Sequence, residues 1–120
     1  MAGVEKRSFD SPDETRTPDK TQVDVVHLGG TTAARFRMEP GWSWSECVQP
    51  VAGTDSCQHR HVGMVRSGTM RVTHEDGTVL ELARGDVYVI EPGHHAEIVS
   101  DEPFEAFEFQ PQAAEEYARQ

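Results

Sequence analysis

The chain has 120 residues and a mass of 13.4 kDa, a length that allows one domain with one modest hydrophobic core. Its formal net charge is −10 at pH 7. That charge argues against nucleic-acid binding, which needs a basic face, and against binding to an anionic membrane. No apolar run approaches the roughly 20 residues of a membrane-spanning helix, and residues 1–10 lack the apolar centre of a signal peptide. We therefore expect a soluble, cytoplasmic protein.

Both ends of the chain differ in composition from its middle. Residues 1–21 are charged and contain prolines, without hydrophobic periodicity, so we predict a segment that is flexible or draped over the domain surface. Residues 113–119 (AAEEYAR) have a helical pattern, which predicts a short C-terminal helix or tail over residues 113–120. The core must then come from residues 22–112.

This middle part breaks into short runs of β-type sequence separated by glycine and proline. The runs cover residues 23–28, 32–38, 42–48, 61–65, 69–74, 78–82, 87–90, 95–99 and 104–109. Asp76-Gly77 marks a hairpin turn, because glycine supplies the positive φ that tight turns demand. Regular short strands with this punctuation favour an antiparallel barrel or sandwich over βαβ units. The sequence therefore predicts an all-β domain.

Histidines on two of these runs suggest a metal site. His59 and His61 are two residues apart, so on a strand their side chains leave the same face, and Cys57 shares that parity if the strand extends back so far. Polar side chains that point into a barrel need partners. A divalent metal supplies one, since neutral imidazole binds zinc, iron, nickel and manganese.

A second pair of histidines requires a choice. On a strand, His94 shares its face with Ala96 and Ile98, whereas His95 shares its face with Glu97. The apolar partners favour His94 as the inward residue and the ligand. A distortion at the preceding Pro-Gly would reverse that assignment.

The cysteines and the aromatic residues have structural as well as functional interpretations. Cys47 and Cys57 are too few for a disulfide framework; Cys47 is expected to be a small buried hydrophobe, whereas Cys57 lies beside the histidines and is a candidate ligand. Trp42 and Trp44 would pack in the core or form a pocket wall. The full set of candidate pocket residues is Trp42, Trp44, Glu46, Met70, Tyr88 and Phe107.

Residues 53–68 (GTDSCQHRHVGMVRSG) and 85–95 (GDVYVIEPGHH) resemble the two motifs of the cupin superfamily, G-x5-H-x-H-x3–4-E-x6-G and G-x5-P-x-G-x2-H-x3-N. Gly53, His59 and His61 fit the opening of the first motif. Gly85 and Gly93 fit the second, with its proline one place late. The resemblance to small stand-alone bacterial cupins covers nearly the whole chain. It implies a cupin barrel (a double-stranded β-helix or jelly roll) that pairs as a homodimer.

Two registers of the first motif remain open. No glutamate follows His61 at the family's spacing, and counting back from Gly68 places His61 at the glutamate position, with Asp55 and Cys57 at the two histidine positions. In the other register His59 and His61 are the ligand pair, and the loop that follows them is four residues shorter.

The second motif is altered as well. Its histidine position falls on Ala96, and His94 lies two residues earlier on the same face. The site available to the chain is therefore an altered one, drawn from Cys57, His59, His61 and His94. Its thiolate favours zinc, with iron, nickel or manganese as alternatives.

The resemblance implies several kinds of function. Metal-dependent cupins include oxygenases, isomerases and lyases, so the first hypothesis is a mononuclear metal site that acts on or binds a small oxygenated molecule, with Glu46, His74 or Tyr88 as candidate general bases. A second is a non-catalytic ligand or metal sensor, or a cupin that binds a protein partner. A third is a structural dimer with a vestigial site. We expect a small-molecule ligand, and neither a nucleic acid nor a membrane as partner.

Overall fold

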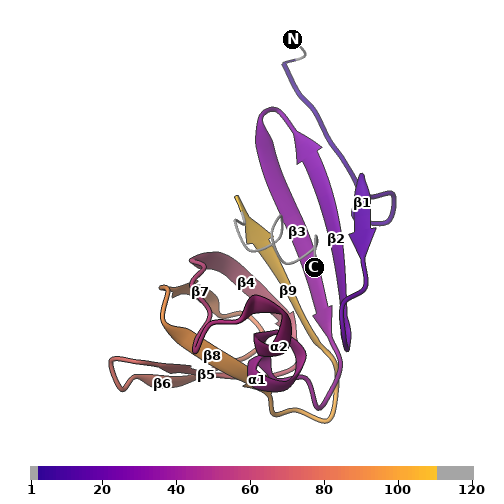
Figure 1. Cartoon of the computed structure of the whole chain (residues 1–120). Helices are drawn as coiled ribbons and strands as arrows, with labels where there is room; N and C mark the ends of the chain where they lie inside the picture. The colour runs from indigo at the N-terminus through magenta and orange to yellow at the C-terminus, as the bar shows by residue number, and fades with distance from the viewer. Residues whose placement is uncertain (1–2, 111–120) are drawn as a thin grey trace.

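Two antiparallel sheets face each other in the computed structural model, which describes residues 3–110 (Figure 1). The larger sheet has the strand order β1-β2-β3-β9-β4-β7, and the smaller has the order β6-β5-β8. The strands are β1 (Glu14–Arg16), β2 (Thr21–Leu28), β3 (Thr31–Met38), β4 (His61–Ser67), β5 (Met70–His74), β6 (Val79–Leu82), β7 (Val87–Ile90), β8 (His94–Ile98) and β9 (Phe104–Phe109). This architecture confirms the predicted all-β jelly-roll barrel.

The core lies between the sheets and follows the strand alternation. One row of cross-strand partners runs across four strands of the larger sheet, from Val23 to Phe36, Ala106 and Val65, and each is at most 3% exposed. Because neighbouring inward side chains on paired strands lie within contact distance, this row forms one continuous wall. The smaller sheet contributes buried Met70, Val72, Leu82, Ala96 and Ile98 to the facing wall.

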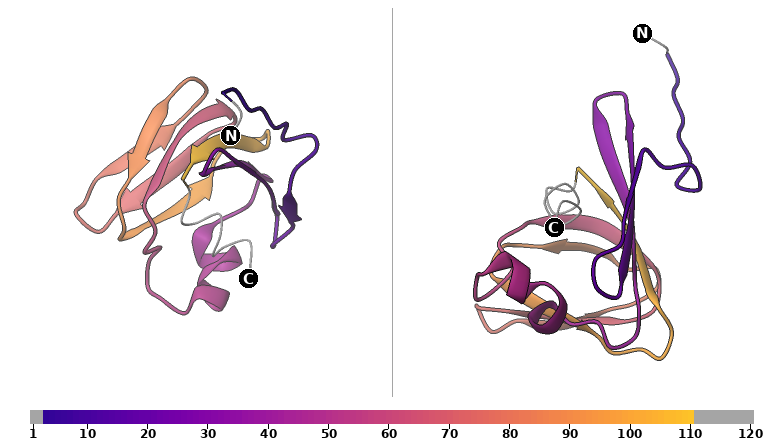
Figure 2. Two further views of the ribbon diagram at one scale, coloured as in Figure 1. Left: turned by 90° about the horizontal axis from the view of Figure 1, so that it is seen from above. Right: turned by 45° about the vertical axis from the view of Figure 1, so that its right-hand side comes forward.

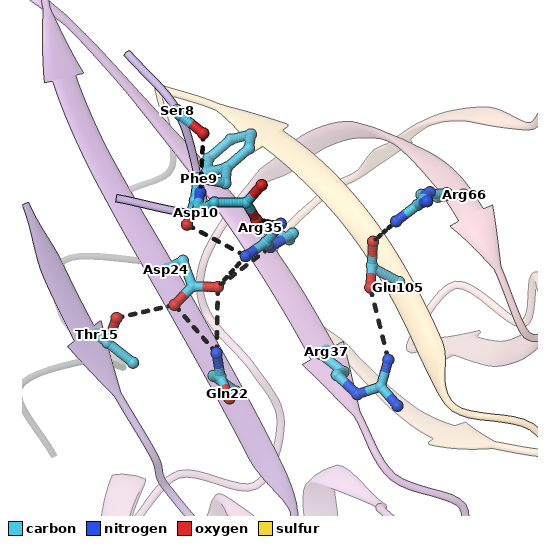
Figure 3. Close-up of polar contacts among 10 residues, drawn as sticks. All are labelled: Ser8, Phe9, Asp10, Thr15, Gln22, Asp24, Arg35, Arg37, Arg66 and Glu105. Carbon is cyan, nitrogen blue, oxygen red and sulfur yellow. Dashed lines mark hydrogen bonds and ion pairs between the residues drawn. The ribbon is translucent and has the colours of Figure 1, made fainter. Parts of the chain in front are cut away.

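The turn end of the β2–β3 hairpin extends beyond the other strands of the larger sheet, and the segment before β2 runs along it (Figure 2). β1 pairs with β2, and the Phe9 ring stacks on Phe107 of β9 at a centroid distance of 5.5 Å. Arg35 of β3 lies over the same Phe9 ring and donates to the Asp24 carboxylate at 2.8 Å (Figure 3). The N-terminal segment is therefore attached to the outer face of the larger sheet by stacking and by charged hydrogen bonds.

A second charged group lies further along this outer face. Glu105 is 7% exposed and accepts from Arg66 at 2.6 Å, with Arg37 at 3.7 Å from its other oxygen (Figure 3). A buried carboxylate is tolerated where cationic donors compensate its lost hydration. Arg66 lies at the point where the β4–β9 register shifts, so this bulge and the ion pair occur together.

The prediction of a strand over residues 42–48 is wrong. Two short helices replace it, α1 (Trp44–Cys47) and α2 (Gln49–Ala52), and their coils are visible between β4 and β8 in Figure 1. Ser43 is the N-cap of α1, and its side chain accepts from the Glu46 amide at 3.3 Å. The sequence Ser-x-x-Glu is a capping-box signature, which the alternation of tryptophan and serine obscured.

The predicted C-terminal helix over residues 113–120 lies outside the described residues. Within residues 3–110, no helix has the length and apolar character needed to span a membrane.

Candidate metal centre

A cavity of about 290 Å³ opens between the two sheets beside α1 and α2. Four of the six predicted pocket residues, Trp42, Trp44, Met70 and Tyr88, line it. These residues come from both sheets and from the helical segment, so the cavity is the hollow centre of the barrel.

Glu46 and Phe107 were also predicted to line the pocket, and they do not. Because residues 44–47 form a helix, Trp44 and Cys47 are buried while Glu46 is exposed. Phe107 has the outward parity of β9 and stacks on Phe9 outside the barrel. In both cases the backbone conformation decided which way the side chain points.

Three candidate ligands meet at the wall of this cavity. Cys57, His61 and His94 each offer a donor atom, and these atoms all lie within 4.8 Å of one another. The Cys57 Sγ–His61 Nε2 distance is 3.8 Å, and the His61 and His94 rings meet edge to face at 5.1 Å.

The backbone brings these three residues together. His61 begins β4 and His94 begins β8, whereas Cys57 precedes β4 in an isolated bridge to His94. In that bridge the Cys57 amide donates to the His94 carbonyl at 2.7 Å, and the Gly93 amide donates to the Cys57 carbonyl at 2.8 Å. The thiol and the His94 ring are thus held side by side by main-chain hydrogen bonds.

Both imidazoles are oriented by acceptors on their far side. His94 Nδ1 lies 2.7 Å from the Glu91 carbonyl oxygen, and His61 Nδ1 lies 2.9 Å from Glu108 Oε1. Carbonyl and carboxylate oxygens only accept, so each Nδ1 carries a proton and each Nε2 is the nitrogen left to bind a metal. A carbonyl or carboxylate behind the ring is the usual arrangement for a metal-binding histidine.

The donor set fits a divalent metal such as zinc. A tetrahedral zinc ion with a thiolate and two imidazoles spaces its donors about 3.6 Å apart, close to the 3.8 Å between Cys57 and His61. Three protein donors at a cavity wall leave one coordination position facing the cavity, as in catalytic zinc sites. A thiolate with two imidazoles suits zinc better than magnesium or calcium.

The electrostatics of the cluster favour a thiolate. Burial by itself raises the pKa of the Cys57 thiol, but hydrogen bonds from His61 and His94 outweigh it and lower that pKa to about 6. Burial by itself lowers the pKa of His61, but the charge of Glu108 and contact with Cys57 raise it to about 10. Without a metal, the cluster therefore holds a thiolate beside a protonated imidazole at neutral pH, and a metal ion would replace that proton.

Comparison with known proteins gives a fold and no closer relationship. No family model matches the chain, and no curated protein matches it. Among solved structures, a Rhizobium leguminosarum protein of unknown function is 19% identical, with a TM-score of 0.63 over 92% of this chain and 100% of that one. An RmlC-like cupin from Shewanella frigidimarina is 17% identical, with a TM-score of 0.61 over 95% and 96% of the two chains. The chain has the cupin fold.

A Lactobacillus farciminis oxalate decarboxylase, solved as a formate complex, is 15% identical with a TM-score of 0.63. This cupin-fold chain is covered over 93% of its length but spans only 35% of that decarboxylase. The agreement confirms the cupin fold that the sequence motifs implied. Identities in this range establish the architecture, so chemistry must be argued from the site.

Within the cupin fold, the structure groups the ligands of one motif register. Cys57 and His61 lie together, as in the register that places His61 at the glutamate position, whereas His59 lies outside the three-residue group and lines the cavity. The parity argument for His59 does not apply, because β4 begins at His61 and residues 58–60 are irregular. At the second motif, His94 is 4% exposed and turned inward, and His95 is exposed.

Glu108 is a further residue of the site that was not among those predicted from the sequence. This residue is 6% exposed, and its two carboxylate oxygens accept from His61 Nδ1 at 2.9 Å and from the Tyr88 hydroxyl at 2.7 Å. Its parity was a usable signal, since Glu108 shares a strand face with Phe104 and Ala106, both buried. A carboxylate on an apolar strand face is expected to have a specific partner.

None of the three candidate general bases lies freely in the cavity. Glu46 is exposed on α1. His74 lies outside the cavity wall, with Nε2 2.9 Å from the Pro92 carbonyl and Nδ1 accepting from the Asp76 amide. Tyr88 lines the cavity, but its hydroxyl donates to Glu108, and burial together with that carboxylate raises the Tyr88 pKa.

Proposed function

We propose that this cupin binds one divalent metal, preferably zinc, through Cys57 Sγ, His61 Nε2 and His94 Nε2, and binds a small oxygenated molecule in the cavity beside it. The observation that carries the proposal is the orientation of the two imidazoles. The Glu91 carbonyl and the Glu108 carboxylate engage both Nδ1 atoms, which leaves the two Nε2 atoms to a metal, and His61 Nε2 lies 3.8 Å from the Cys57 sulfur.

When bound, such a metal supplies a Lewis acid that polarises an oxygen donor of the ligand. The chain's own residues orient the metal ligands and shield the bound molecule from water. Glu108 fixes the His61 tautomer, Tyr88 fixes Glu108, and the apolar walls exclude water from the ligand.

Ligand binding without turnover is the second candidate function, and one observation favours it. Glu108 is the one acidic side chain among the described residues that line the cavity, and both of its oxygens are already engaged. A general base needs a lone pair within reach of the substrate. A sensor or carrier needs none, so the engagement of Glu108 suits ligand binding more readily than proton transfer by that residue.

The metal proposal is tested on protein purified without an affinity tag. Elemental analysis should find about one metal per chain, and less than about 0.2 would count against the site. Replacing the metal by Co²⁺ should give a thiolate-to-cobalt charge-transfer band in the near ultraviolet. That band should vanish in Cys57→Ser and persist in the matched control Cys47→Ser, because Cys47 is buried outside the cluster.

The same measurement distinguishes the two motif registers. His61→Ala should abolish stoichiometric metal binding, whereas His59→Ala should retain it, since His59 lies outside the three-residue group. Lost metal in His59→Ala would favour the other register, in which His59 and His61 are the ligand pair, and retained metal in His61→Ala would remove His61 from the site.

We also propose that the protein pairs as a homodimer through the outer face of β4 and β7. Within residues 3–110, β7 forms one edge of the larger sheet, and Val87 and Val89 on it are 76% and 55% exposed. They lie opposite Met64 and Val62 of β4, which are also exposed. A second copy would cover both this apolar face and the strand edge. Light scattering should give a molar mass of twice the chain mass for the wild type. The Val87→Lys variant should have the mass of a single chain.

A further inference from the structure

We infer that the ligand of this site has an apolar, ring-sized body and a single metal-binding oxygen group, and that the cavity disfavours small dianions. The inference rests on the proposed metal centre and specifies what that centre would bind. It comes from the chemistry of the residues that line the cavity besides the three metal ligands.

The wall is aromatic and apolar. Both tryptophans of the chain, Trp42 and Trp44, line the cavity and are 4% exposed. Phe36, Phe104 and Met70 complete this part of the wall from β3, β9 and β5. Aromatic and thioether side chains offer large contact areas to a flat apolar group and few hydrogen bonds. A ligand body that matches this wall is itself apolar.

The wall also lacks cations. Among the described residues that line the cavity, none is lysine or arginine. Arg60 lies between the cavity residues His59 and His61 in the sequence, yet its exposed side chain pairs with Glu91 at 2.6 Å. Sites that recognise carboxylate or phosphate groups usually present Arg or Lys to them. The metal would then be the cavity's one strong positive charge, enough for one anionic oxygen group.

Apart from His59 and the two indole N–H groups, the polar side chains that remain on the cavity wall are few and mostly engaged. Thr54 and Gln58 both donate to the Ser56 carbonyl, at 2.8 and 3.3 Å. Glu108 is occupied by His61 and Tyr88. A ligand with several hydroxyl groups would leave most of them without partners inside the barrel, which costs free energy for each group. A sugar-like polyol is therefore disfavoured along with the dianion.

The cavity limits the size of the ligand. Its volume of about 290 Å³ is at the lower end of small-molecule sites, which run from roughly 300 to 1,000 Å³. One substituted ring with its oxygen group fits such a space, and a fused polycyclic ligand exceeds it. The chemical class is therefore a monocyclic aromatic or similarly sized apolar compound with one chelating oxygen function.

Three probes test this class on the zinc-loaded full chain by calorimetric titration. Benzohydroxamate and acetohydroxamate carry the same metal-binding group and differ in the ring, while oxalate carries two carboxylates and no apolar body. Benzohydroxamate should bind at least about tenfold more tightly than acetohydroxamate, because the ring removes apolar surface from water. Oxalate should bind most weakly. Equal affinity for the two hydroxamates, or tighter binding of oxalate, would overturn the inference while leaving the metal centre intact.

A variant localises the effect. Trp44→Leu should reduce the preference for benzohydroxamate over acetohydroxamate by about fivefold or more, and the control Phe109→Leu, at an aromatic residue 54% exposed on β9, should leave it unchanged. If Trp44→Leu does not fold, the wild-type comparison of the three probes still decides. Metal content is measured before any ligand is added, so a chain that binds no zinc is recognised as a failure of the proposed function, which removes the inference as well.

Discussion

Glu108 Oε1 lies 2.9 Å from His61 Nδ1, on the side of the ring opposite the Cys57 sulfur. The Tyr88 hydroxyl donates to the other oxygen of Glu108 at 2.7 Å. Since one carboxylate accepts from both groups, the orientation of a candidate metal ligand on β4 depends on residues of β7 and β9. The first prediction tests this dependence.

Glu108→Gln should weaken zinc binding by about 10- to 100-fold, the usual effect of removing a carboxylate that supports a metal-binding histidine. The amide keeps the shape of the side chain but loses its charge. Competition with a chromophoric chelator measures the affinity. Glu97→Gln is the matched control, because Glu97 lies on β8 near His94 but is exposed and pairs with Arg71. Unchanged affinity in Glu108→Gln would show that Glu108 has no part in metal binding.

The low pKa of Cys57 predicts a reactive thiol in the metal-free protein. In a Cys47→Ser background, the rate of alkylation should rise as the pH passes about 6 and then level off, because the thiolate is the nucleophile. If the pKa of the thiol were the ordinary 9.0, the alkylation rate would instead keep rising until the pH reached about that value. One equivalent of zinc should suppress the reaction. A rate that still climbs above pH 8 would disprove the thiolate assignment.

The same two groups predict how stability depends on pH without metal. The Cys57 pKa is lowered from 9.0 to about 6, so its contribution is complete above pH 9.0 and is lost as the pH falls to about 6. The His61 pKa is raised from 6.5 to about 10, so its contribution is complete below pH 6.5 and is lost as the pH rises to about 10. Because the two slopes oppose each other, the difference in unfolding free energy between the wild type and the double variant Cys57→Ser/His61→Ala should change little from pH 6.5 to 9.0.

Cys57→Ser and the double variant Cys57→Ser/His61→Ala separate these contributions. Cys57→Ser keeps the histidine and Glu108, so relative to the double variant its unfolding free energy in urea should fall as the pH rises above about 6.5. A rise over that range would contradict the assignment of a raised pKa to His61.

Gly63→Ala should disrupt the site through steric overlap. A Cβ at Gly63 would lie 2.9 Å from both the Glu108 Cγ and the Tyr88 hydroxyl oxygen, and closer still to the Phe107 carbonyl oxygen. A backbone oxygen cannot rotate away, so we expect a destabilisation of about 3 kcal/mol or more, together with weaker zinc binding. Chemical denaturation measures the first effect. Gly3→Ala is the control, because nothing lies within 4 Å of a Cβ at that position.

Arg35→Met should detach the N-terminal segment from the larger sheet. Asp24 is 3% exposed and would lose the charged partner shown in Figure 3, keeping only its hydrogen bonds from Thr15 and Gln22. We expect a loss of about 2 kcal/mol in unfolding free energy and faster proteolysis near residues 7–20. Arg71→Met, which removes an exposed arginine on the smaller sheet, should change stability little. Similar losses in both variants would refute a specific role for Arg35.

Local sequence was sufficient for most strands, because each strand's inward face repeats every second residue. Val23 and Val25 on β2, or Phe104 and Ala106 on β9, are buried as their alternation predicts. The same rule placed His94 inward. It failed at residues 42–48, where the Ser43 cap on the Glu46 amide creates a helix that a period-two pattern cannot describe.

The sequence by itself determined the cupin architecture and the candidate ligands, since strand alternation, turn glycines and histidine positions are all local properties of the chain. Only the tertiary structure decided that Cys57 belongs with His61 and His94, that His59 does not, and that Glu108 stands behind His61. These relationships depend on pairing between strands distant in sequence and on where β4 begins. A metal site requires its donors to converge within a few ångströms, and spacing along one strand carries no information about distance to another.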